Sequence, residues 1–290
     1  MKKTAKFICL SLAILLYTAG FTQRQMEALD RGVVAVRNNE GKVFVSWRLL
    51  GTEPQELSFN LYRSTEISKP QKVNKTPITS TTSFVDDGSD TTHTISYSVK
   101  AIINGKESEP SKSFVLKKGS QPYLSIPLQT PAGYSAGDGS VGDLDGDGEY
   151  EFVIHMTGRG RDNSQAGQTD PPIFHAYKMD GTLLWSINLG KNIREGAHYT
   201  QFMVYDLDGD GRAEVAMKTA DGSVDAKGKI IGDSTKDWRN SNGYILSGPE
   251  YVTVFDGLTG VALATTDYIP ARHAKLEPTT EELKEVWGDG

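Results

Sequence analysis

Cysteine is almost absent from this sequence. Cys9 is the only cysteine among 290 residues, and it lies inside an N-terminal run that is expected to be removed. The mature chain would therefore contain no thiol and could form no disulfide bond, so a bound metal is the available means of tying its loops together. Cys9 is followed by further hydrophobic residues and is not preceded by a small-residue cleavage site, so a lipid anchor is not expected there.

Long hydrophobic runs are also missing. The uncharged run from Phe7 to Gln23 has 17 residues and includes polar side chains, whereas a membrane span needs roughly 20 apolar residues. Three lysines precede this run, and Thr18-Ala-Gly20 offers small residues for cleavage, which together predict a signal peptide over residues 1–20. An N-terminal membrane anchor is the alternative, and no later stretch could cross a bilayer. The expected location is secreted or periplasmic.

Positive charge is in deficit. The chain has 37 acidic and 31 basic residues and a formal net charge of −6, so general nucleic-acid binding has no electrostatic basis. An anionic substrate would need a local basic patch or a bound cation. The length and the hydrophobic fraction of 37% are those of a globular protein and suggest two domains.

Helical periodicity is absent from residues 30–118, where short alternating segments are separated by turns. The clearest expected strands cover residues 43–50, 57–63 and 95–102. The order of the strands, with Trp47 on an early strand and a tyrosine-containing strand late, resembles that of a fibronectin type III domain. We therefore predict an all-β fold that begins with a fibronectin type III-like β-sandwich over residues 23–118. Its predicted core includes Trp47, Phe59 and Tyr97.

Residues 119 to about 135 are rich in proline and glycine, as expected of a linker, and an internal repeat follows. Two acidic loops begin 63 residues apart, at Asp143 and Asp206, while the later Asp-Gly turns at Asp180 and Asp256 are 76 residues apart. The second unit therefore has about thirteen extra residues, which lie within residues 219–249. Units of four short strands at such spacing are typical of β-propeller blades.

Two blades do not close a propeller, which has about four to eight, and a lone pair would leave sheet edges open. We therefore expect residues 119–290 to form a truncated part of a propeller domain. A short helix is expected over residues 278–287, because Thr279 and Glu282 have the spacing of a capping box.

The two acidic loops predict two calcium sites. In each loop three aspartates alternate with glycines that permit a tight curl, and a glutamate at the ninth position can close an oxygen shell at about 2.3–2.6 Å from Ca²⁺. The seventh residue is expected to contribute its backbone carbonyl. An EF-hand is excluded because its glutamate comes at the twelfth position, and a solvated acidic turn remains the alternative. The predicted ligands are Asp143, Asp145, Asp147, Glu149 and Glu151 in the first loop and Asp206, Asp208, Asp210, Arg212 and Glu214 in the second.

Several longer segments form specific motifs: Val45-Ser-Trp-Arg-Leu-Leu-Gly51, Gly196-Ala-His-Tyr-Thr-Gln-Phe202, Lys218-Thr-Ala-Asp-Gly222 and Trp287-Gly-Asp-Gly290. These motifs resemble those of polysaccharide lyase family 11, the rhamnogalacturonan lyases, and the match covers nearly the whole mature chain. The resemblance implies a secreted, pectin-degrading lyase with a calcium-loaded, eight-bladed propeller behind a small β domain, of which this chain would be the N-terminal part. It further implies that the substrate is rhamnogalacturonan I, an anionic polysaccharide, and the complete protein is expected to be a monomer.

The implied reaction is β-elimination between galacturonate and rhamnose. Removal of the C5 proton builds negative charge on the adjacent carboxyl group, so a cation or an arginine must neutralise that charge while a base takes the proton and O4 departs. Cationic and amide side chains in two segments are candidates for substrate binding. They are Arg159, Arg161, Asn163, Lys218 and Arg239.

Two of these candidates, and two histidines, have a plainer interpretation. Arg159 and Arg161 could be solvated loop charges, and His155 and His198 lie in or beside expected strands, where a structural histidine is the simpler interpretation. No catalytic base is assigned, and the resemblance implies that most cationic catalytic groups belong to later blades. The alternative function is a calcium-stabilised propeller fragment that binds glycans or proteins without chemistry.

Overall fold

The structure is a computed structural model that describes residues 27–89, 92–162, 164–196 and 200–287. Strands dominate these residues, and the helix described among them is α2 (Thr280–Trp287), which has the predicted capping box: Thr279 N–H donates to Glu282 Oε2 at 2.9 Å. The predicted signal peptide over residues 1–20 lies outside the described residues. Within the described part, no helix is long and apolar enough to span a membrane.

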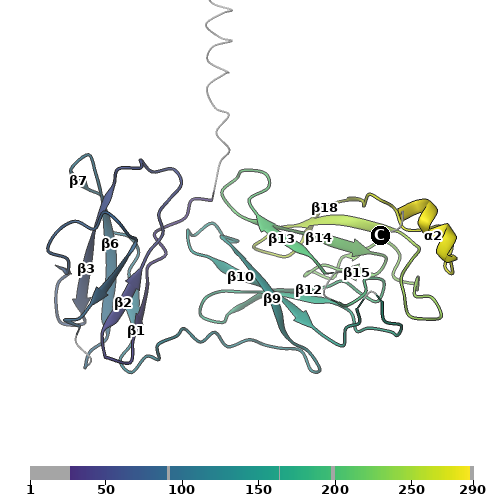
Figure 1. Ribbon diagram of the computed structural model, residues 1–290, viewed down its shortest axis with the longest axis horizontal. Helices are drawn as coiled ribbons and strands as arrows, with labels where there is room; N and C mark the ends of the chain where they lie inside the picture. The colour runs from purple at the N-terminus through teal and green to yellow at the C-terminus, as the bar shows by residue number, and fades with distance from the viewer. Residues whose placement is uncertain (1–26, 90–91, 163, 197–199, 288–290) are drawn as a thin grey trace, which may run out of the picture.

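Two antiparallel sheets form the N-terminal sandwich (Figure 1). The three-stranded sheet has the order β1 (Val34–Arg37), β2 (Val43–Ser46) and β5 (Ser83–Asp86). The other sheet has the order β4 (Gln71–Lys72), β3 (Ser58–Thr65), β6 (Ile95–Ile103) and β7 (Lys106–Glu107), and β8 (Phe114–Leu116) pairs with β6. Apart from the short β7, this division of strands is that of a fibronectin type III-like sandwich, as the alternating pattern predicts.

The predicted sandwich core is confirmed. Trp47 and Phe59 are buried, and their rings meet edge to face with centroids 5.4 Å apart. Tyr97 is fully buried and donates a hydrogen bond from its hydroxyl to Asp86 Oδ2 at 2.8 Å. Each such side chain stabilises the fold by about 1.5–3 kcal/mol through the removal of apolar surface from water.

A six-stranded and a four-stranded antiparallel sheet follow, and each contains four strands in the order expected for a blade. The first blade contains β9 (Ser135–Gly142), β10 (Glu151–Thr157), β11 (Ile173–Tyr177) and β12 (Leu183–Asn188). The second blade contains β13 (Phe202–Tyr205), β14 (Glu214–Ala220), β17 (Glu250–Phe255) and β18 (Ala262–Asp267). Residues 117–134, between β8 and β9, contain neither strand nor helix.

The extra residues of the second blade extend the first blade. They include a hairpin of β15 (Ser223–Val224) and β16 (Ile230–Ile231), and β15 pairs with the outer strand β12 through Asn188 and Val224. The insertion therefore links the two sheets by backbone hydrogen bonds in addition to side-chain packing.

The facing surfaces of the two blades share one apolar core. Phe174 and Ile187 of the first blade are buried in the same cluster as Val215 and Phe255 of the second blade. Within the second blade the backbone also approaches closely, because a Cβ at Gly257 would lie 1.8 Å from the Ala213 carbonyl oxygen. The sandwich has a separate cluster of buried residues.

Candidate functional site

The first acidic loop curls around two buried carboxylates. Asp143 accepts the N–H of Gly146 at Oδ1 and the N–H of Gly148 at Oδ2, at 2.8 and 2.9 Å. Glu151 at the ninth position accepts the N–H of Leu144 at 2.8 Å through Oε2. Both glycines have positive φ angles, 78° and 89°, which only glycine adopts without strain.

The second loop repeats this geometry. Asp206 accepts the N–H groups of Gly209 and Gly211 at 2.6 and 3.0 Å, and Glu214 Oε2 accepts the N–H of Leu207 at 2.8 Å. Asp206 and Glu214 are buried, as are Asp143 and Glu151. Asp208 and Asp210 are exposed, so the alternative of a solvated acidic turn stays open for this loop.

Carboxylate oxygens in each loop are close enough to share one ion. Oxygens of Asp143, Asp145 and Glu151 lie within 4.8 Å of one another in the first loop. Oxygens of Asp206, Asp208 and Asp210 do so in the second loop. Both clusters could therefore hold a metal ion, and a hard, oxygen-preferring cation fits this donor set.

Electrostatics in the loops also favour a bound cation. Burial, together with the charges of Asp145 and Asp147, raises the pKa of Glu151 to about 7. Burial likewise raises the pKa values of Asp143 and Glu214. A cation at the centre of each loop would favour the ionised forms of these carboxyl groups.

Four predicted metal residues lie outside the two clusters of close carboxylates. Asp147 forms an ion pair with Lys112 at 3.7 Å, and the Arg212 guanidinium pairs with Asp210 Oδ2 at 2.8 Å. Glu214 contributes to its loop through the hydrogen bond to Leu207. The side chain of Glu149 faces the cleft between the sandwich and the first blade, which agrees with a prediction that used only its backbone carbonyl.

A cavity of about 380 Å³ lies at the opposite end of β10 from the first acidic loop. Polar and charged side chains dominate its wall, and they come from β9, β10 and two neighbouring loops. The lining residues are Gly137, Asp138, His155, Thr157, Gly160, Arg161, Asp162, Gln165, Glu195, Gly196 and Thr200.

A buried pair forms part of this wall. His155 Nε2 lies 2.9 Å from Glu195 Oε2, and both side chains are almost fully buried. The imidazole also stacks on Phe174, with ring centroids 5.0 Å apart. His155 packs on Phe174 on one side and lines the cavity on the other, so its position fits both a structural and a catalytic histidine. His198 lies outside the described residues.

The substrate candidates of the first segment, at residues 159–163, lie in different surroundings. Arg161 lines the cavity, whereas Arg159 pairs with Asp170, with Nη2 3.2 Å from Oδ1, and is absent from the cavity wall. Asn163 lies outside the described residues. The solvated-charge interpretation therefore fits Arg159 better than Arg161.

The two later candidates, Lys218 and Arg239, also lie in different surroundings. Lys218 forms an ion pair with Glu250 at 3.4 Å and lies 5.3 Å from the centre of the Tyr268 ring. Because its neighbour Met217 packs into the core between the blades, strand alternation places Lys218 on the other face of β14, away from the first blade. Arg239 pairs with Asp237 and lies near the loop of Arg161, with Nη1 3.5 Å from Gln168 Oε1.

Arg194 connects the two candidate loops and was missed by sequence reasoning. Its buried guanidinium donates from Nη1 to the Gly243 carbonyl oxygen at 2.9 Å and lies 4.4 Å from the centre of the Tyr244 ring. Nearby, the N–H of Gly167 donates to the Asn242 carbonyl oxygen at 2.7 Å. The insertion thus packs directly on the loop that follows Arg161. No motif surrounds Arg194, so the sequence carries no signal for this role.

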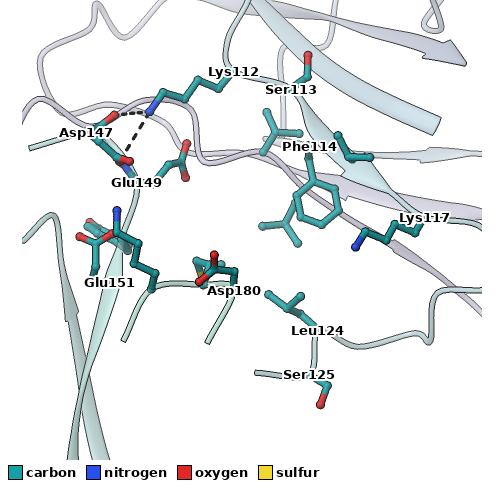
Figure 2. Close-up of a pocket in the computed structure, with 16 residues that line it drawn as sticks. Lys112, Ser113, Phe114, Lys117, Leu124, Ser125, Asp147, Glu149, Glu151 and Asp180 are labelled. Atoms are coloured by element: carbon teal, nitrogen blue, oxygen red, sulfur yellow. Dashed lines mark hydrogen bonds and ion pairs between the residues drawn. The ribbon is translucent and has the colours of Figure 1, made fainter. Parts of the chain in front are cut away.

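A second cavity, of about 600 Å³, lies between the sandwich and the first blade. Figure 2 shows acidic side chains of the first loop on one side, including Asp147 and Glu149, and Phe114 and Leu124 on the other. Among the predicted substrate residues that the structure describes, Arg159, Arg161, Lys218 and Arg239 do not line it.

Comparisons with known proteins assign the family. Residues 123–288 match the model of the rhamnogalacturonan lyase family 11 C-terminal domain, and residues 24–116 match the β-sheet domain of rhamnogalacturonan I lyases. The chain belongs to rhamnogalacturonan lyase family 11. The resemblance in the sequence is thereby confirmed.

Two family members from Bacillus subtilis and one solved structure are similar to most of this chain. The rhamnogalacturonan endolyase YesW of Bacillus subtilis is 53% identical over 260 residues, which cover 86% of this chain and 40% of that protein. The exolyase YesX of the same organism is 49% identical, with coverage of 92% and 42%. The structure of a Bacillus licheniformis rhamnogalacturonan lyase superposes with a TM-score of 0.76 at 55% identity and covers 86% of this chain and 43% of that one. The chain thus spans about two fifths of the length of these relatives.

Proposed function

We propose that this chain supplies the sandwich and the first two blades of a secreted or periplasmic lyase that cleaves the backbone of rhamnogalacturonan I by β-elimination. The observation that carries the proposal is the match of both domains to rhamnogalacturonan lyases, at 53% identity to an endolyase and 49% to an exolyase. Similarity to both an endolyase and an exolyase leaves the mode of cleavage unassigned. A cleaved signal peptide over residues 1–20 would deliver the protein to its substrate outside the cytoplasm.

The cavity beside Arg161 is the proposed contact with the polysaccharide. A guanidinium can bind a uronate carboxylate with two parallel hydrogen bonds, and Asp138 and Gln165 in the same wall can bind sugar hydroxyls. Arg239 lies next to this loop and could extend the contact. Arg159 and Lys218 are engaged in ion pairs elsewhere and are assigned to structure.

Calcium is the proposed metal of both acidic loops. The donor atoms are carboxylate and carbonyl oxygens, and carboxylates close to one another are a calcium-type arrangement. When bound, calcium would neutralise and cross-link the carboxylates of each loop and so stabilise the blade. The residues that would hold it are those of the two predicted ligand sets.

Binding of rhamnogalacturonan I oligosaccharides, measured by titration calorimetry, tests the site. Arg161→Ala should weaken binding about tenfold or more, because a hydrogen bond to a charged group contributes roughly 1.5–3 kcal/mol. Arg159→Ala is the matched control from the same loop and should change binding less than twofold. Equal effects of the two variants would remove Arg161 from the proposed site.

Activity is tested separately through the ultraviolet absorbance of the unsaturated C4–C5 product. A protein that extends this chain with further blades should generate that absorbance from rhamnogalacturonan I with calcium. The 290-residue chain alone should not, because two blades cannot surround a substrate channel. Absorbance from the chain alone would place the reactive groups within these two blades. Binding without absorbance by the extended protein would support the non-catalytic alternative.

A further inference from the structure

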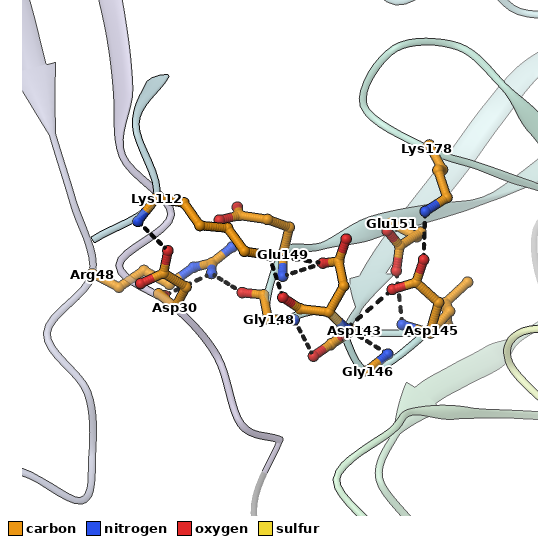
Figure 3. A network of polar contacts seen from close by, with 12 residues as sticks. Asp30, Arg48, Lys112, Asp143, Asp145, Gly146, Gly148, Glu149, Glu151 and Lys178 are labelled. Atoms are coloured by element: carbon orange, nitrogen blue, oxygen red, sulfur yellow. Dashed lines mark hydrogen bonds and ion pairs between the residues drawn. The ribbon is translucent and has the colours of Figure 1, made fainter. Parts of the chain in front are cut away.

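The two acidic loops share their internal geometry but differ in what touches them. In the first loop, the Gly148 carbonyl oxygen accepts two hydrogen bonds from the sandwich (Figure 3). One comes from the N–H of Asp30 at 2.8 Å and the other from Arg48 Nη1 at 3.1 Å. The sandwich therefore binds the backbone of a predicted calcium loop directly.

Further contacts surround this pair of hydrogen bonds. Lys112 donates its backbone N–H to Asp30 Oδ2 at 2.8 Å, and its ammonium group contacts both the carbonyl oxygen and the carboxylate of Asp147. The Arg48 guanidinium lies 4.0 Å from the centre of the Tyr150 ring, where the cation is attracted to the face of the ring. Glu27, which precedes β1, accepts the N–H of Asp143 at 3.1 Å. Three separate segments of the chain thus meet on the first loop.

Glycines at equivalent positions show the same asymmetry. Gly148 and Gly211 are the sixth residues of their loops and have φ angles of 89° and 95°. A Cβ at Gly148 would lie 3.0 Å from the Asp30 nitrogen and 3.2 Å from the Ala28 carbonyl oxygen, whereas a Cβ at Gly211 would meet no atom within 4 Å. The space above the first loop is filled by the segment that leads into the sandwich.

We propose that the first loop is a calcium-dependent clamp that holds the sandwich against the first blade, while the second loop stabilises the blades alone. The inference rests on the proposed binding of calcium. Gly148 donates its N–H to Oδ2 of Asp143, a member of the carboxylate cluster, at 2.9 Å, so an ion that fixes Asp143 also helps to fix the backbone at Gly148. Without calcium the crowded carboxylates repel one another, and the acceptor for Asp30 and Arg48 is no longer held in place.

Distances between two spin labels can test this clamp on the whole chain. One label replaces the exposed Glu66 of the sandwich and the other the exposed Lys227 of the insertion hairpin, as Glu66→Cys and Lys227→Cys, with Cys9→Ser to remove the native thiol. With calcium the distance distribution should be narrow, and chelation with EDTA should widen it at least twofold.

Variants then distinguish the roles of the two loops. In calcium, Asp145→Asn should widen the distribution as EDTA does, whereas Asp208→Asn, at the same position of the second loop, should leave it narrow. Arg48→Ala should also widen it while both loops still bind calcium by calorimetry, because Arg48 is not a predicted ligand. Equal widths for Asp145→Asn and Asp208→Asn would overturn the clamp.

Calorimetry keeps the two proposals apart. If no calcium binds, the calcium assignment fails and the clamp fails with it. If calcium binds to both loops and raises the melting temperature but the distance distribution stays the same with and without EDTA, only the clamp fails.

Discussion

The first and second acidic loops are nearly the same sequence in two different surroundings. Each begins Asp-Leu-Asp-Gly-Asp-Gly, and in each the first aspartate accepts two glycine N–H groups. The first loop lies under the sandwich, through Gly148 and Asp147, whereas the space beside Gly211 is open. The motif therefore determines the shape of the loop, and its neighbours determine what else depends on that shape.

Charge provides a second contrast. The seventh residue is Glu149 in the first loop and Arg212 in the second, so one loop has five acidic residues and the other has four and an arginine. Arg212 pairs with Asp210 inside its own loop, while Asp145 of the first loop meets Lys178, which follows β11. The first loop therefore has one more carboxylate than the second, while Lys112 and Lys178 both pair with its aspartates.

Removal of calcium is expected to have the largest effect. An ion that binds only the folded state stabilises it by roughly 2.7 kcal/mol per site at a hundredfold excess over its Kd. With two sites, EDTA should lower the melting temperature of the 290-residue chain by roughly 10 °C or more, measured by calorimetry. An unchanged melt in EDTA would rule out a stabilising metal.

The sandwich provides the control for that experiment. Residues 23–118 contain neither acidic loop, and their buried cluster is separate from that of the blades. This segment should fold alone, with a melting temperature that calcium and EDTA leave unchanged. Disorder of the isolated segment, or a melt that responds to calcium, would contradict the predicted boundary near residue 118.

Much of this architecture follows from local spacing. The acidic loops, the sandwich core and the order of blade strands could be predicted because each is encoded in a short run of residues. The first strand of the first blade was missed: β9 contains three glycines and was not predicted as a strand, because glycine has a low strand propensity. Its place in the sheet comes from pairing with β10 and not from its own composition.

The substrate residues were harder to predict than the metal residues. Alternation along β14 could have shown that Lys218 shares a face with Ala216 and not with the buried Met217. The role of Arg194 could not be predicted, because it depends on Gly243 and Tyr244, about fifty residues later in the chain. Contacts between distant loops leave no periodic signal in one sequence.

Substitution of the first aspartate in each loop should have the next largest effect. Asp143→Asn and Asp206→Asn each place an amide NH₂ against a glycine N–H and remove a charge from the metal shell, at a cost of roughly 2–3 kcal/mol in unfolding free energy. Asp143→Asn should lower the unfolding free energy more, because the first loop has more carboxylates and also contacts the sandwich. Urea unfolding in calcium measures both, and a larger cost for Asp206→Asn would reverse the comparison.

Alanine at the sixth position isolates the contact with the sandwich. Gly148→Ala and Gly211→Ala should share a backbone penalty of roughly 1–2 kcal/mol, because both φ angles are positive. Gly148→Ala should lose about 1 kcal/mol more, since its Cβ presses on the segment at Ala28 and Asp30. Urea unfolding gives the difference, and only Gly148→Ala should widen the spin-label distances. Equal losses of unfolding free energy would show that the segment at Ala28 and Asp30 can shift at little cost and does not depend on the loop.

Arg212→Glu gives the second loop the charge pattern of the first and is expected to have the smallest effect. Arg212 is partly exposed and forms an ion pair with Asp210, so its loss should cost only about 0.2–1 kcal/mol. In EDTA the added carboxylate should lower the melting temperature by a few degrees, and calcium should restore most of that loss.

The control is Arg212→Gln, which removes the positive charge without adding a negative one and keeps most of the aliphatic stem that lies against Gly146. If charge determines how strongly each loop depends on calcium, the difference in melting temperature between calcium and EDTA should increase in the order Arg212, Arg212→Gln, Arg212→Glu. If all three proteins show the same difference, the seventh residue does not influence the ion. The unequal behaviour of the two loops would then have to come from the sandwich contacts at Gly148 and Asp147 alone.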